Sequence, residues 1–160
     1  MSLQKGDKAP SFTLVDTDKK EVSLEDYKGK TLILHFFPAA FTGTCTAQLC
    51  AIRDGISMYH NDHCDVVAIS VDSVFTLIKF KADQNLNFTL LSDFNKTVSP
   101  AYGVLLEDFA LGMKNVSGRS VFLIDGNGII QYSQILEKQG DMPDFAALNA
   151  ALAGLTASNQ

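Results

Sequence analysis

Two dense apolar runs, Thr31–Phe37 and Val66–Val71, stand out in the first half of the chain. Neither run alternates between apolar and polar positions, so each predicts a strand that is buried on both faces of a sheet. The spacing of apolar residues changes after Thr42. Apolar residues there recur at three- and four-residue steps, at Leu49, Ile52, Ile56 and Tyr59. This spacing is typical of the buried stripe of an amphipathic helix, so a helix is predicted between the two strands.

Shorter apolar segments predict two β-hairpins. Ser11–Val15 and Glu21–Leu24 flank a polar turn and predict an N-terminal hairpin. Ser120–Ile124 and Ile129–Ser133 flank an Asp-Gly-Asn-Gly segment, which has the strongest turn chemistry in the chain. We therefore expect antiparallel pairing within each of these two pairs of segments.

Further elements complete the predicted pattern. Ser73 is placed to cap the next helix. The apolar face of that helix is formed by Phe75, Ile78, Phe80 and Ala82. Phe88–Leu91 predicts a short third strand, and Lys96–Tyr102 predicts a brief helical stretch. Pro143–Leu155 predicts a closing helix with proline in its first turn.

Strands that alternate with helices, followed by a hairpin and a final helix, predict an α/β fold with a mixed central sheet and helices on both faces. The chain has no internal repeat, low-complexity tract or linker. Its 160 residues match the usual length of one domain, about 100–200 residues. Residues 1–160 are therefore predicted to form a single domain with an N-terminal β-hairpin.

Composition and charge narrow the classes of function. Apolar residues make up 46% and charged residues 19% of the chain, which is typical of a folded globular protein. A net charge of −5 argues against nucleic-acid binding, which needs clustered Lys and Arg. No apolar run approaches the ~20 residues that cross a membrane, and the polar start of the chain is unlike a signal peptide. We therefore expect a soluble cytoplasmic protein with no nucleic-acid or membrane partner.

Cys45 has a position that favours chemistry at sulfur. It follows a buried strand and Pro38, and Thr42 stands three residues earlier, so Cys45 is predicted in the opening turn of a helix. Backbone N–H groups are unsatisfied in that turn and the helix dipole is positive, and both stabilise a thiolate. The hydroxyl of Thr42 can cap the helix or hydrogen-bond the thiolate. The alternative interpretation is an inert, buried cysteine.

Cys50 is the second candidate, five residues along the same predicted helix. An ideal helix places residues i and i+5 roughly 8–9 Å apart at Cα, beyond the ~7 Å limit for a disulfide. A disulfide between Cys45 and Cys50 would therefore require the first turns of the helix to unwind. The spacing is not Cys-x-x-Cys, which disfavours a thioredoxin-like disulfide reductase or a zinc ribbon. Three cysteines are also too few for a secreted disulfide framework.

Cys64, the third cysteine, lies in the polar segment His60–Asp65. Two imidazoles, a thiol and two carboxylates in this segment are all capable metal ligands. Their spacing matches no established metal site, so a solvated loop is favoured. Cys64 stays open as an alternative disulfide partner for Cys45. His35, inside the first apolar run, is interpreted as a core histidine with one satisfied nitrogen.

The segment Phe36–Cys45, with the sequence Phe-Phe-Pro-Ala-Ala-Phe-Thr-Gly-Thr-Cys, resembles the peroxiredoxin signature Pro-x-x-x-Thr-x-x-Cys. The continuation Cys45–Asp54 is similar to the bacterioferritin comigratory protein (peroxiredoxin Q) branch, where a second cysteine stands five positions after the first. The same region also resembles the alkyl hydroperoxide reductase E branch, which can work with one cysteine. The resemblance covers nearly the whole chain, because the family pattern is also followed at Gly6–Leu14, Ala68–Asp72 and Arg119–Gly128.

The resemblance implies a thioredoxin-like fold and peroxide reduction with no metal or organic cofactor. Cys45 would be the peroxidatic thiolate, which attacks the peroxide O–O bond and becomes a sulfenic acid. Thr42 would hydrogen-bond the thiolate and the peroxide, and Pro38 would shield the thiolate. Arg119 matches the site arginine of the family, whose charge favours a thiolate and polarises oxygen. Cys50 matches the resolving cysteine, which condenses with the sulfenic acid to form a disulfide.

The implied partners are a peroxide substrate, either hydrogen peroxide or an organic hydroperoxide, and a thiol reductant such as thioredoxin. A monomer and a homodimer are both compatible with the resemblance. Two alternatives stay open. One is a one-cysteine peroxidase whose sulfenic acid is reduced directly by an external thiol. The other is a redox-sensing or chaperone-like binding protein in which oxidation of Cys45 is a signal.

Overall fold

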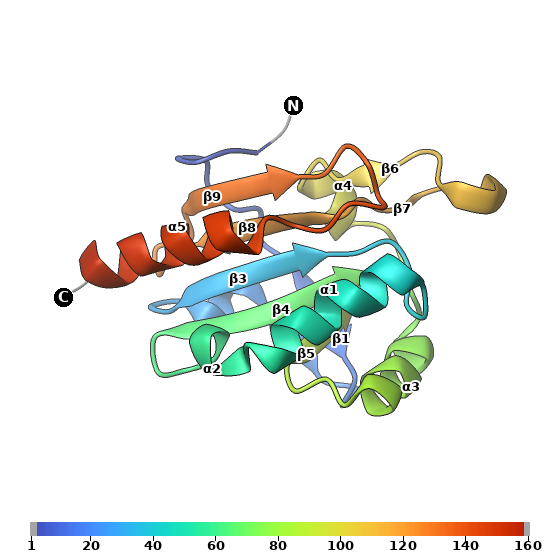
Figure 1. The fold of residues 1–160 in the computed structure, drawn as a ribbon, viewed down its shortest axis with the longest axis horizontal. Helices are drawn as coiled ribbons and strands as arrows, with labels where there is room; N and C mark the ends of the chain where they lie inside the picture. Colours follow the sequence, from blue (N-terminus) through green and yellow to red (C-terminus); the bar gives the residue numbers. More distant parts are fainter. Residues whose placement is uncertain (1–2, 159–160) are drawn as a thin grey trace.

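The computed structural model describes residues 3–158, and a mixed β-sheet lies at its centre (Figure 1). Within this part of the chain, seven strands pair in the order β2-β1-β5-β4-β3-β8-β9. Because β3 is parallel to β4 and antiparallel to β8, the sheet is mixed, as predicted. In sheet order the strands are β2 (Glu21–Ser23), β1 (Thr13–Asp16), β5 (Thr89–Ser92), β4 (Cys64–Ser70), β3 (Thr31–Phe36), β8 (Ser120–Ile124) and β9 (Ile130–Ile135).

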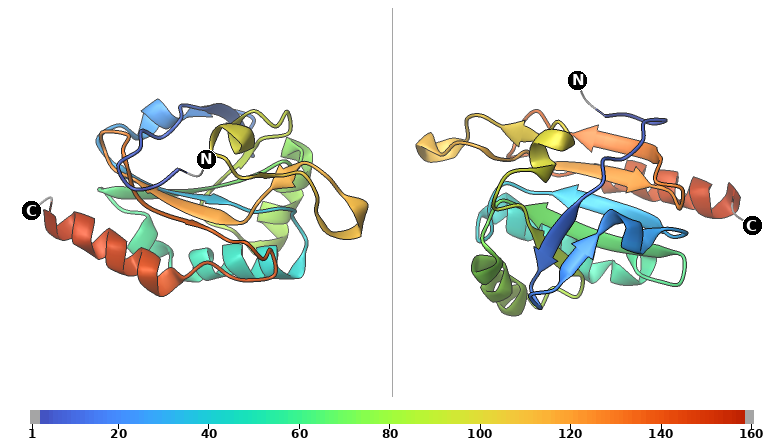
Figure 2. Two further views of the ribbon diagram at one scale, coloured as in Figure 1. Left: turned by 90° about the horizontal axis from the view of Figure 1, so that it is seen from above. Right: turned by 180° about the vertical axis from the view of Figure 1, so that it is seen from behind.

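Helices lie on both faces of this sheet, but the longer ones share one face (Figure 2). That face is covered by α1 (Gly43–Asp54), α2 (Ile56–Tyr59), α3 (Val74–Gln84) and α5 (Phe145–Ser158). The opposite face is covered by the N-terminal segment, the 3-10 helix η1 (Leu24–Tyr27) and α4 (Val98–Ala101). Ile33 and Leu34 are neighbours on β3 but belong to the two separate hydrophobic clusters on these faces. This arrangement explains why β3 is buried at every position.

Both predicted hairpins are confirmed, since β1 pairs antiparallel with β2, and β8 with β9. The structure adds a small sheet of β6 (Leu105–Leu106) and β7 (Val116–Ser117), which the sequence did not predict. Strands of two residues show no readable alternation, so the pattern could not reveal them. Their connection contains the 3-10 turn η2 (Ala110–Gly112) and projects from the body of the molecule (Figure 1).

The amphipathic stripe after Thr42 is buried largely as expected, but it belongs to two helices. Leu49 and Tyr59 are both buried, yet α1 ends at Asp54 and α2 begins after Gly55. Glycine has the greatest conformational freedom to lose in a helix, so the helix ends there at little cost. The apolar period continued across this break, which is why the sequence alone suggested one helix.

The helix α3 begins as predicted, but its buried face is different. The hydroxyl oxygen of Ser73 accepts a hydrogen bond from the backbone N–H of Thr76 at 3.2 Å, so the predicted cap is confirmed. The prediction was wrong at Phe75, which is 73% exposed, and at Ala82, which is also exposed, whereas Leu77 and Phe80 are buried. Residues five apart in a helix diverge by about 140°, so Phe75 cannot share the face of Phe80.

The closing helix starts two residues later than predicted. The carboxylate of Asp144 accepts a hydrogen bond from the backbone N–H of Ala147 at 3.0 Å, and α5 begins at Phe145. Aspartate is a favoured residue immediately before a helix, because it satisfies a free N–H of the first turn. Pro143 therefore lies outside the first turn. None of the described helices is long and apolar enough to cross a membrane.

Candidate active site

The candidate site forms where β3 ends and α1 begins. The loop between them contains Pro38, which is buried, and Phe41, whose φ of 68° lies in the left-handed region. The ring of Phe41 lies against Phe80 of α3, with ring centroids 5.1 Å apart. The backbone N–H of Ala40 donates to Oδ2 of Asp72 at 2.8 Å, which ties the loop to the segment after β4. These contacts fix the direction in which the chain enters α1.

Cys45 is the third residue of α1, so its predicted place in the first turn is confirmed. The first helical hydrogen bond runs from the N–H of Thr46 to the carbonyl of Thr42 at 2.9 Å. The N–H groups before it have no acceptor within the helix. Cys45 is a free, fully buried thiol, and Nη2 of Arg119 donates to its sulfur at 3.3 Å.

Arg119 lies directly before β8 and is only 2% exposed. Besides the sulfur of Cys45, its guanidinium donates to Oε1 of Gln48 at 2.7 Å and to the carbonyl of Gln139 at 2.7 and 3.0 Å. No carboxylate of the described residues forms an ion pair with this guanidinium. A buried cation without a counter-ion is unfavourable, so its field favours negative charge on the adjacent sulfur.

Gln48 joins the guanidinium to the central strand. It is fully buried on α1, three residues after Cys45 and therefore on the same side of the helix. Because its Oε1 accepts from Arg119, its Nε2 must donate toward Nδ1 of His35, which is 3.0 Å away. The Nδ1 of His35 is then the acceptor, and the ring is the neutral tautomer with its proton on Nε2.

Burial lowers the pKa of His35 to about 3, which predicts a pH-dependent stability. Histidine in an unfolded chain titrates near pH ~6.5, so between these two values the unfolded chain binds one more proton than the folded chain. Stability from this group is complete above pH ~6.5 and is lost as the pH falls. We expect the free energy of unfolding to decrease by up to about 1.4 kcal/mol per pH unit, measured by urea denaturation between about pH 6 and pH 4.

The variant His35→Asn keeps an acceptor toward Gln48 but does not titrate. Its free energy of unfolding should therefore depend less steeply on pH, by up to about 1.4 kcal/mol per pH unit. The matched control is His63→Asn, at an exposed histidine that has no role in the site. If His35→Asn shows the same slope as the wild type, His35 does not control acid stability.

Gln139, in the connection between β9 and α5, is the second glutamine that holds Arg119 in place. Its carbonyl accepts from the guanidinium, and its Oε1 accepts from the backbone N–H of Arg119 at 2.6 Å. Neither a role for Gln139 nor the contact between Gln48 and His35 was predicted from the sequence. Gln48 could have been identified as a site residue from the sequence, because it is a polar residue three positions from Cys45 on a helix face expected to be buried. Gln139 could not have been identified in this way, because it lies in a polar loop.

Thr42 is the residue before α1, but its side chain does not cap the helix. Its hydroxyl donates to the carbonyl of Ala39 at 2.7 Å, and the expected hydrogen bond to Cys45 is absent. A hydroxyl has one proton and two lone pairs. With the proton directed to Ala39, the oxygen of Thr42 is left to accept a hydrogen bond from a ligand.

Cys50 lies on the same uninterrupted helix as Cys45, so the separation expected from ideal helix geometry applies. Its thiol donates to Oε1 of Gln84, the last residue of α3, at 3.6 Å. Arg53, one turn further along α1, donates to the carbonyl of Gln84 at 2.6 Å. The part of α1 that carries Cys50 is therefore fastened to the end of α3.

Cys64 begins β4 and is buried in the same hydrophobic cluster as Cys45. Burial, with a smaller contribution from Asp65, raises the pKa of its thiol to about 12. In the adjoining loop, Nδ1 of His60 lies 2.6 Å from Asp65, which also pairs with Lys30 at 3.6 Å. Among the described residues, no three His, Cys, Asp or Glu side chains are grouped to hold a metal ion.

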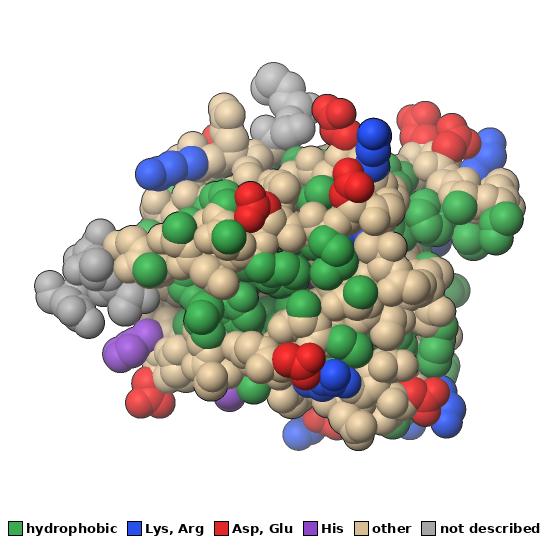
Figure 3. Space-filling model, in the orientation of Figure 1, with side chains coloured by type: hydrophobic (Ala, Val, Ile, Leu, Met, Phe, Trp, Pro, Cys, Tyr) green, Lys and Arg blue, Asp and Glu red, His purple; other side chains and the backbone are tan. Residues whose placement is uncertain are grey.

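A cavity of about 570 Å³ opens beside the site and reaches Arg119. It is lined by Thr42, Gly43, Thr44, Asp108, Phe109, Ala110, Arg119, Gln139 and Gly140. Its outer wall belongs to the projecting connection between β6 and β7, where Leu111 is 96% exposed. Hydrophobic side chains gather on this projection, at the right of Figure 3. Arg119, whose guanidinium contacts Cys45, therefore belongs to the wall of this cavity.

Known proteins share both the sequence and the fold of this chain. The model of the AhpC/TSA family matches residues 5–133. A Mycobacterium tuberculosis protein whose name places it among the peroxiredoxins is 43% identical over 134 residues, or 82% of this chain and 85% of the relative. Peroxiredoxin Q of Oryza sativa subsp. japonica is 38% identical over 130 residues, which cover 81% of this chain and 58% of the relative.

Solved structures agree with these sequence matches. Peroxidoxin BcpB from Mycobacterium tuberculosis superposes with a TM-score of 0.81 at 29% identity, over 97% of both chains. The reduced 2-Cys peroxiredoxin of Plasmodium vivax has a TM-score of 0.85 at 28% identity, over 98% of this chain and 84% of the other. The expected thioredoxin-like fold is thereby confirmed, and the chain belongs to the AhpC/TSA family, to which the peroxiredoxins belong.

Proposed function

We propose that the protein reduces hydrogen peroxide and organic hydroperoxides with Cys45 as the attacking sulfur. Membership of the AhpC/TSA family supports thiol peroxidase activity, with a peroxide as substrate and a thiol as reductant. The observation that carries the proposal is the guanidinium of Arg119, buried without a carboxylate partner among the described residues and 3.3 Å from the sulfur of Cys45. This arrangement stabilises negative charge at one sulfur, which is what nucleophilic attack by a thiol requires.

In the proposed first step, the thiolate of Cys45 attacks one oxygen of the peroxide. The S–O bond forms as the O–O bond breaks, the sulfur is oxidised to a sulfenic acid, and the second oxygen leaves as water or an alcohol after taking up a proton. Arg119 is placed to offset the negative charge that develops on the leaving oxygen. The oxygen of Thr42 accepts from the peroxide O–H, and buried Pro38 limits access of water to the sulfur.

In the proposed second step, Cys50 attacks the sulfur of the sulfenic acid. An S–S bond forms as the S–O bond breaks, and the hydroxide leaves as water after taking up the proton that the Cys50 thiol releases. A dithiol of the thioredoxin type then reduces the disulfide and restores both thiols. Because intact α1 holds Cys45 and Cys50 too far apart, this step requires residues 44–51 to unwind and Cys50 to leave Gln84.

The resolving step predicts a specific pattern of masses and amide exchange. After one equivalent of peroxide, we expect the wild type to lose two hydrogens by intact mass, because it forms a disulfide. Its amide exchange over residues 44–51 should be faster than in the reduced protein, because the helix has opened. Cys50→Ser should instead gain one oxygen and oxidise further in excess peroxide. Cys64→Ser, at the thiol with the raised pKa, is the control and should behave as the wild type.

Two results would assign the second step differently. If the wild type gains one oxygen and forms no disulfide, Cys50 has only a structural role. The sulfenic acid of Cys45 is then reduced directly by an external thiol. A peptide map that joins Cys45 to Cys64 keeps the peroxidase chemistry but changes the resolving residue.

Steady-state peroxide consumption with thioredoxin, thioredoxin reductase and NADPH tests the function as a whole. We expect sustained turnover that depends on thioredoxin. Turnover with small thiols alone would favour the one-cysteine peroxidase, and a single oxidation without turnover would favour a redox-sensing protein. We also propose that residues 1–160 act as one domain, since Cys45, Arg119 and Gln139 come from distant parts of the chain to form one site. A cytoplasmic location is a separate part of the proposal.

A further inference from the structure

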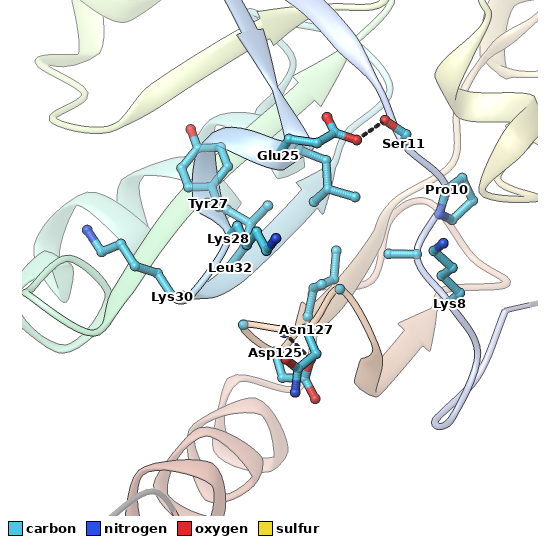
Figure 4. A pocket seen from close by; sticks show the side chains of 15 residues that line it. Lys8, Pro10, Ser11, Glu25, Tyr27, Lys28, Lys30, Leu32, Asp125 and Asn127 are labelled. Carbon is cyan, nitrogen blue, oxygen red and sulfur yellow. Dashed lines mark hydrogen bonds between the residues drawn. The ribbon is translucent and has the colours of Figure 1, made fainter.

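A second cavity, of about 520 Å³, lies at the other end of the β3–β8 pair from the candidate active site (Figure 4). Its apolar floor includes Leu32 at the start of β3 and Ile124 at the end of β8, which are partners in the sheet. Arg119 and Pro38, in contrast, adjoin the opposite ends of these two strands. Three segments form the walls of the cavity, residues 8–11, 24–30 and 124–128.

Hydrogen bonds join each of these three segments to the other two. The N–H of Ala9 donates to the carbonyl of Gly128 at 2.9 Å, and the N–H of Gly29 donates to the carbonyl of Gly126 at 3.0 Å. The hydroxyl of Ser11 donates to Glu25, which closes the ring. A Cβ on Gly126 would lie only 3.0 Å from the backbone of Gly29, so a side chain at this position would push the two segments apart. The cavity is therefore preformed, as small-molecule sites usually are.

Two of the three lysines at this cavity have no ion-pair partner among the described residues. Lys30 pairs with Asp65, but Lys8 and Lys28 have no carboxylate partner among the described residues. In Figure 4, Lys8 and Lys28 stand on opposite sides of the cavity, whereas Lys30 points away from it. A negatively charged group placed between Lys8 and Lys28 would face two ammonium groups.

The two carboxylates in the wall are already occupied by donors of the protein. Glu25 accepts from Ser11. Asp125 accepts from the N–H groups of Asn127 and Ile129 and from the side-chain amide of Gln131, at 2.8–3.0 Å. Because these donors are uncharged, Glu25 and Asp125 also lack an ion-pair partner among the described residues. Their oxygens are nevertheless engaged by the wall, whereas no hydrogen bond within the described part of the chain engages the ammonium groups of Lys8 and Lys28.

We propose that this cavity binds an aliphatic carboxylate, with the hydrocarbon body on the floor of Leu32 and Ile124 and the carboxylate between Lys8 and Lys28. Its volume lies within the range of about 300–1,000 Å³ that is usual for small-molecule sites. The apolar floor excludes a purely ionic ligand such as acetate as the preferred occupant, and the two lysines favour an anion over a neutral chain. The site is independent of Cys45 and does not rest on the proposed peroxidase function.

Titration calorimetry of the full chain with octanoate, 1-octanol and acetate tests the two parts of this proposal. We expect saturable octanoate binding with a Kd at or below about 1 mM, and binding of octanol and acetate that is at least about tenfold weaker. Lys8→Gln/Lys28→Gln should weaken octanoate about tenfold and leave octanol unchanged. Lys79→Gln/Lys114→Gln is the control, because it removes the same charge from two exposed lysines elsewhere and should leave the octanoate Kd unchanged.

Amide spectra with octanoate locate the site, because a carboxylate could also bind at Arg119. Octanoate should shift the amide signals of Ala9, Gly29, Gly126 and Gly128 and leave that of Gln48 in place. The proposal is overturned by an absence of saturable octanoate binding, by octanol binding as tightly as octanoate, or by an unchanged Kd in Lys8→Gln/Lys28→Gln. It is equally overturned if the shifts centre on Gln48.

Discussion

Cys45→Ser is expected to lower peroxide consumption by a factor of at least about 10³ and to leave the fold intact. An alcohol is not ionised in a setting that stabilises a thiolate, so neither the first turn of α1 nor Arg119 can activate it. The substitution also keeps the size of the side chain close to that of cysteine in a fully buried position. The measurement is the second-order rate constant of peroxide loss, with the far-ultraviolet circular dichroism spectrum as the check on folding.

Cys64→Ser is the matched control, since Cys64 is buried in the same hydrophobic cluster. Its rate constant should equal that of the wild type, because the pKa of Cys64 is raised to about 12 and the thiol is not ionised near neutral pH. Near-normal turnover in Cys45→Ser would show that the reactive sulfur lies elsewhere.

Arg119→Ala is expected to slow the oxidation of Cys45 by roughly 10²–10³-fold. A preorganised donor at a developing negative charge is worth about 2–4 kcal/mol, and about 1.4 kcal/mol corresponds to a factor of ten in rate. The guanidinium is 3.3 Å from the sulfur and 2% exposed, so solvent cannot replace it readily. The rate of sulfenic acid formation, followed by rapid-quench mass spectrometry, measures this effect.

Two further variants separate charge from packing at Arg119. Arg119→Lys keeps the positive charge but loses the forked contacts to Gln48 and Gln139, so it should recover only part of the rate. Arg53→Ala removes an arginine that contacts Asp54 and the end of α3 but not Cys45, so it should not change the rate of sulfenic acid formation. A rate constant for Arg119→Ala equal to that of the wild type would mean that the guanidinium has only a structural role.

Much of the fold could be predicted from the sequence because its signals are local. The apolar run that became β3 is buried at every position, as a strand between two layers must be. The turn after β8 and the cap at Ser73 also depend on neighbouring residues alone. The predictions were wrong where the bounds or the buried face of a helix depend on distant contacts or on one residue that interrupts the helix. Gly55 divides one apolar stripe into two helices, and Phe75 lies outside the face that packs on the sheet.

In the candidate site, too, the features that depend on neighbouring residues could be predicted, and those that depend on distant contacts could not. The place of Cys45 in a helical first turn followed from residue order, and Arg119 was identified only by resemblance to a family pattern. The partners of that arginine could not be predicted. Gln48 and Gln139 reach it from α1 and from the loop before α5, and contacts between such distant segments leave no trace in local periodicity. His35 was recognised as a buried histidine with one satisfied nitrogen, but its partner Gln48 was not.

The distance along the chain between the site residues has a consequence for how the protein is made. Arg119 follows Cys45 by 74 residues, and it directly precedes β8, the strand that pairs with β3. Contacts of such long sequence separation carry a large loop-closure cost and form with the overall topology. A chain that is still being synthesised, or that has partly unfolded, therefore holds an ordinary thiol at position 45. With Cys45 as the proposed attacking sulfur, its sensitivity to oxidants would arise at the end of folding and would mark the fraction of molecules that have reached the native state.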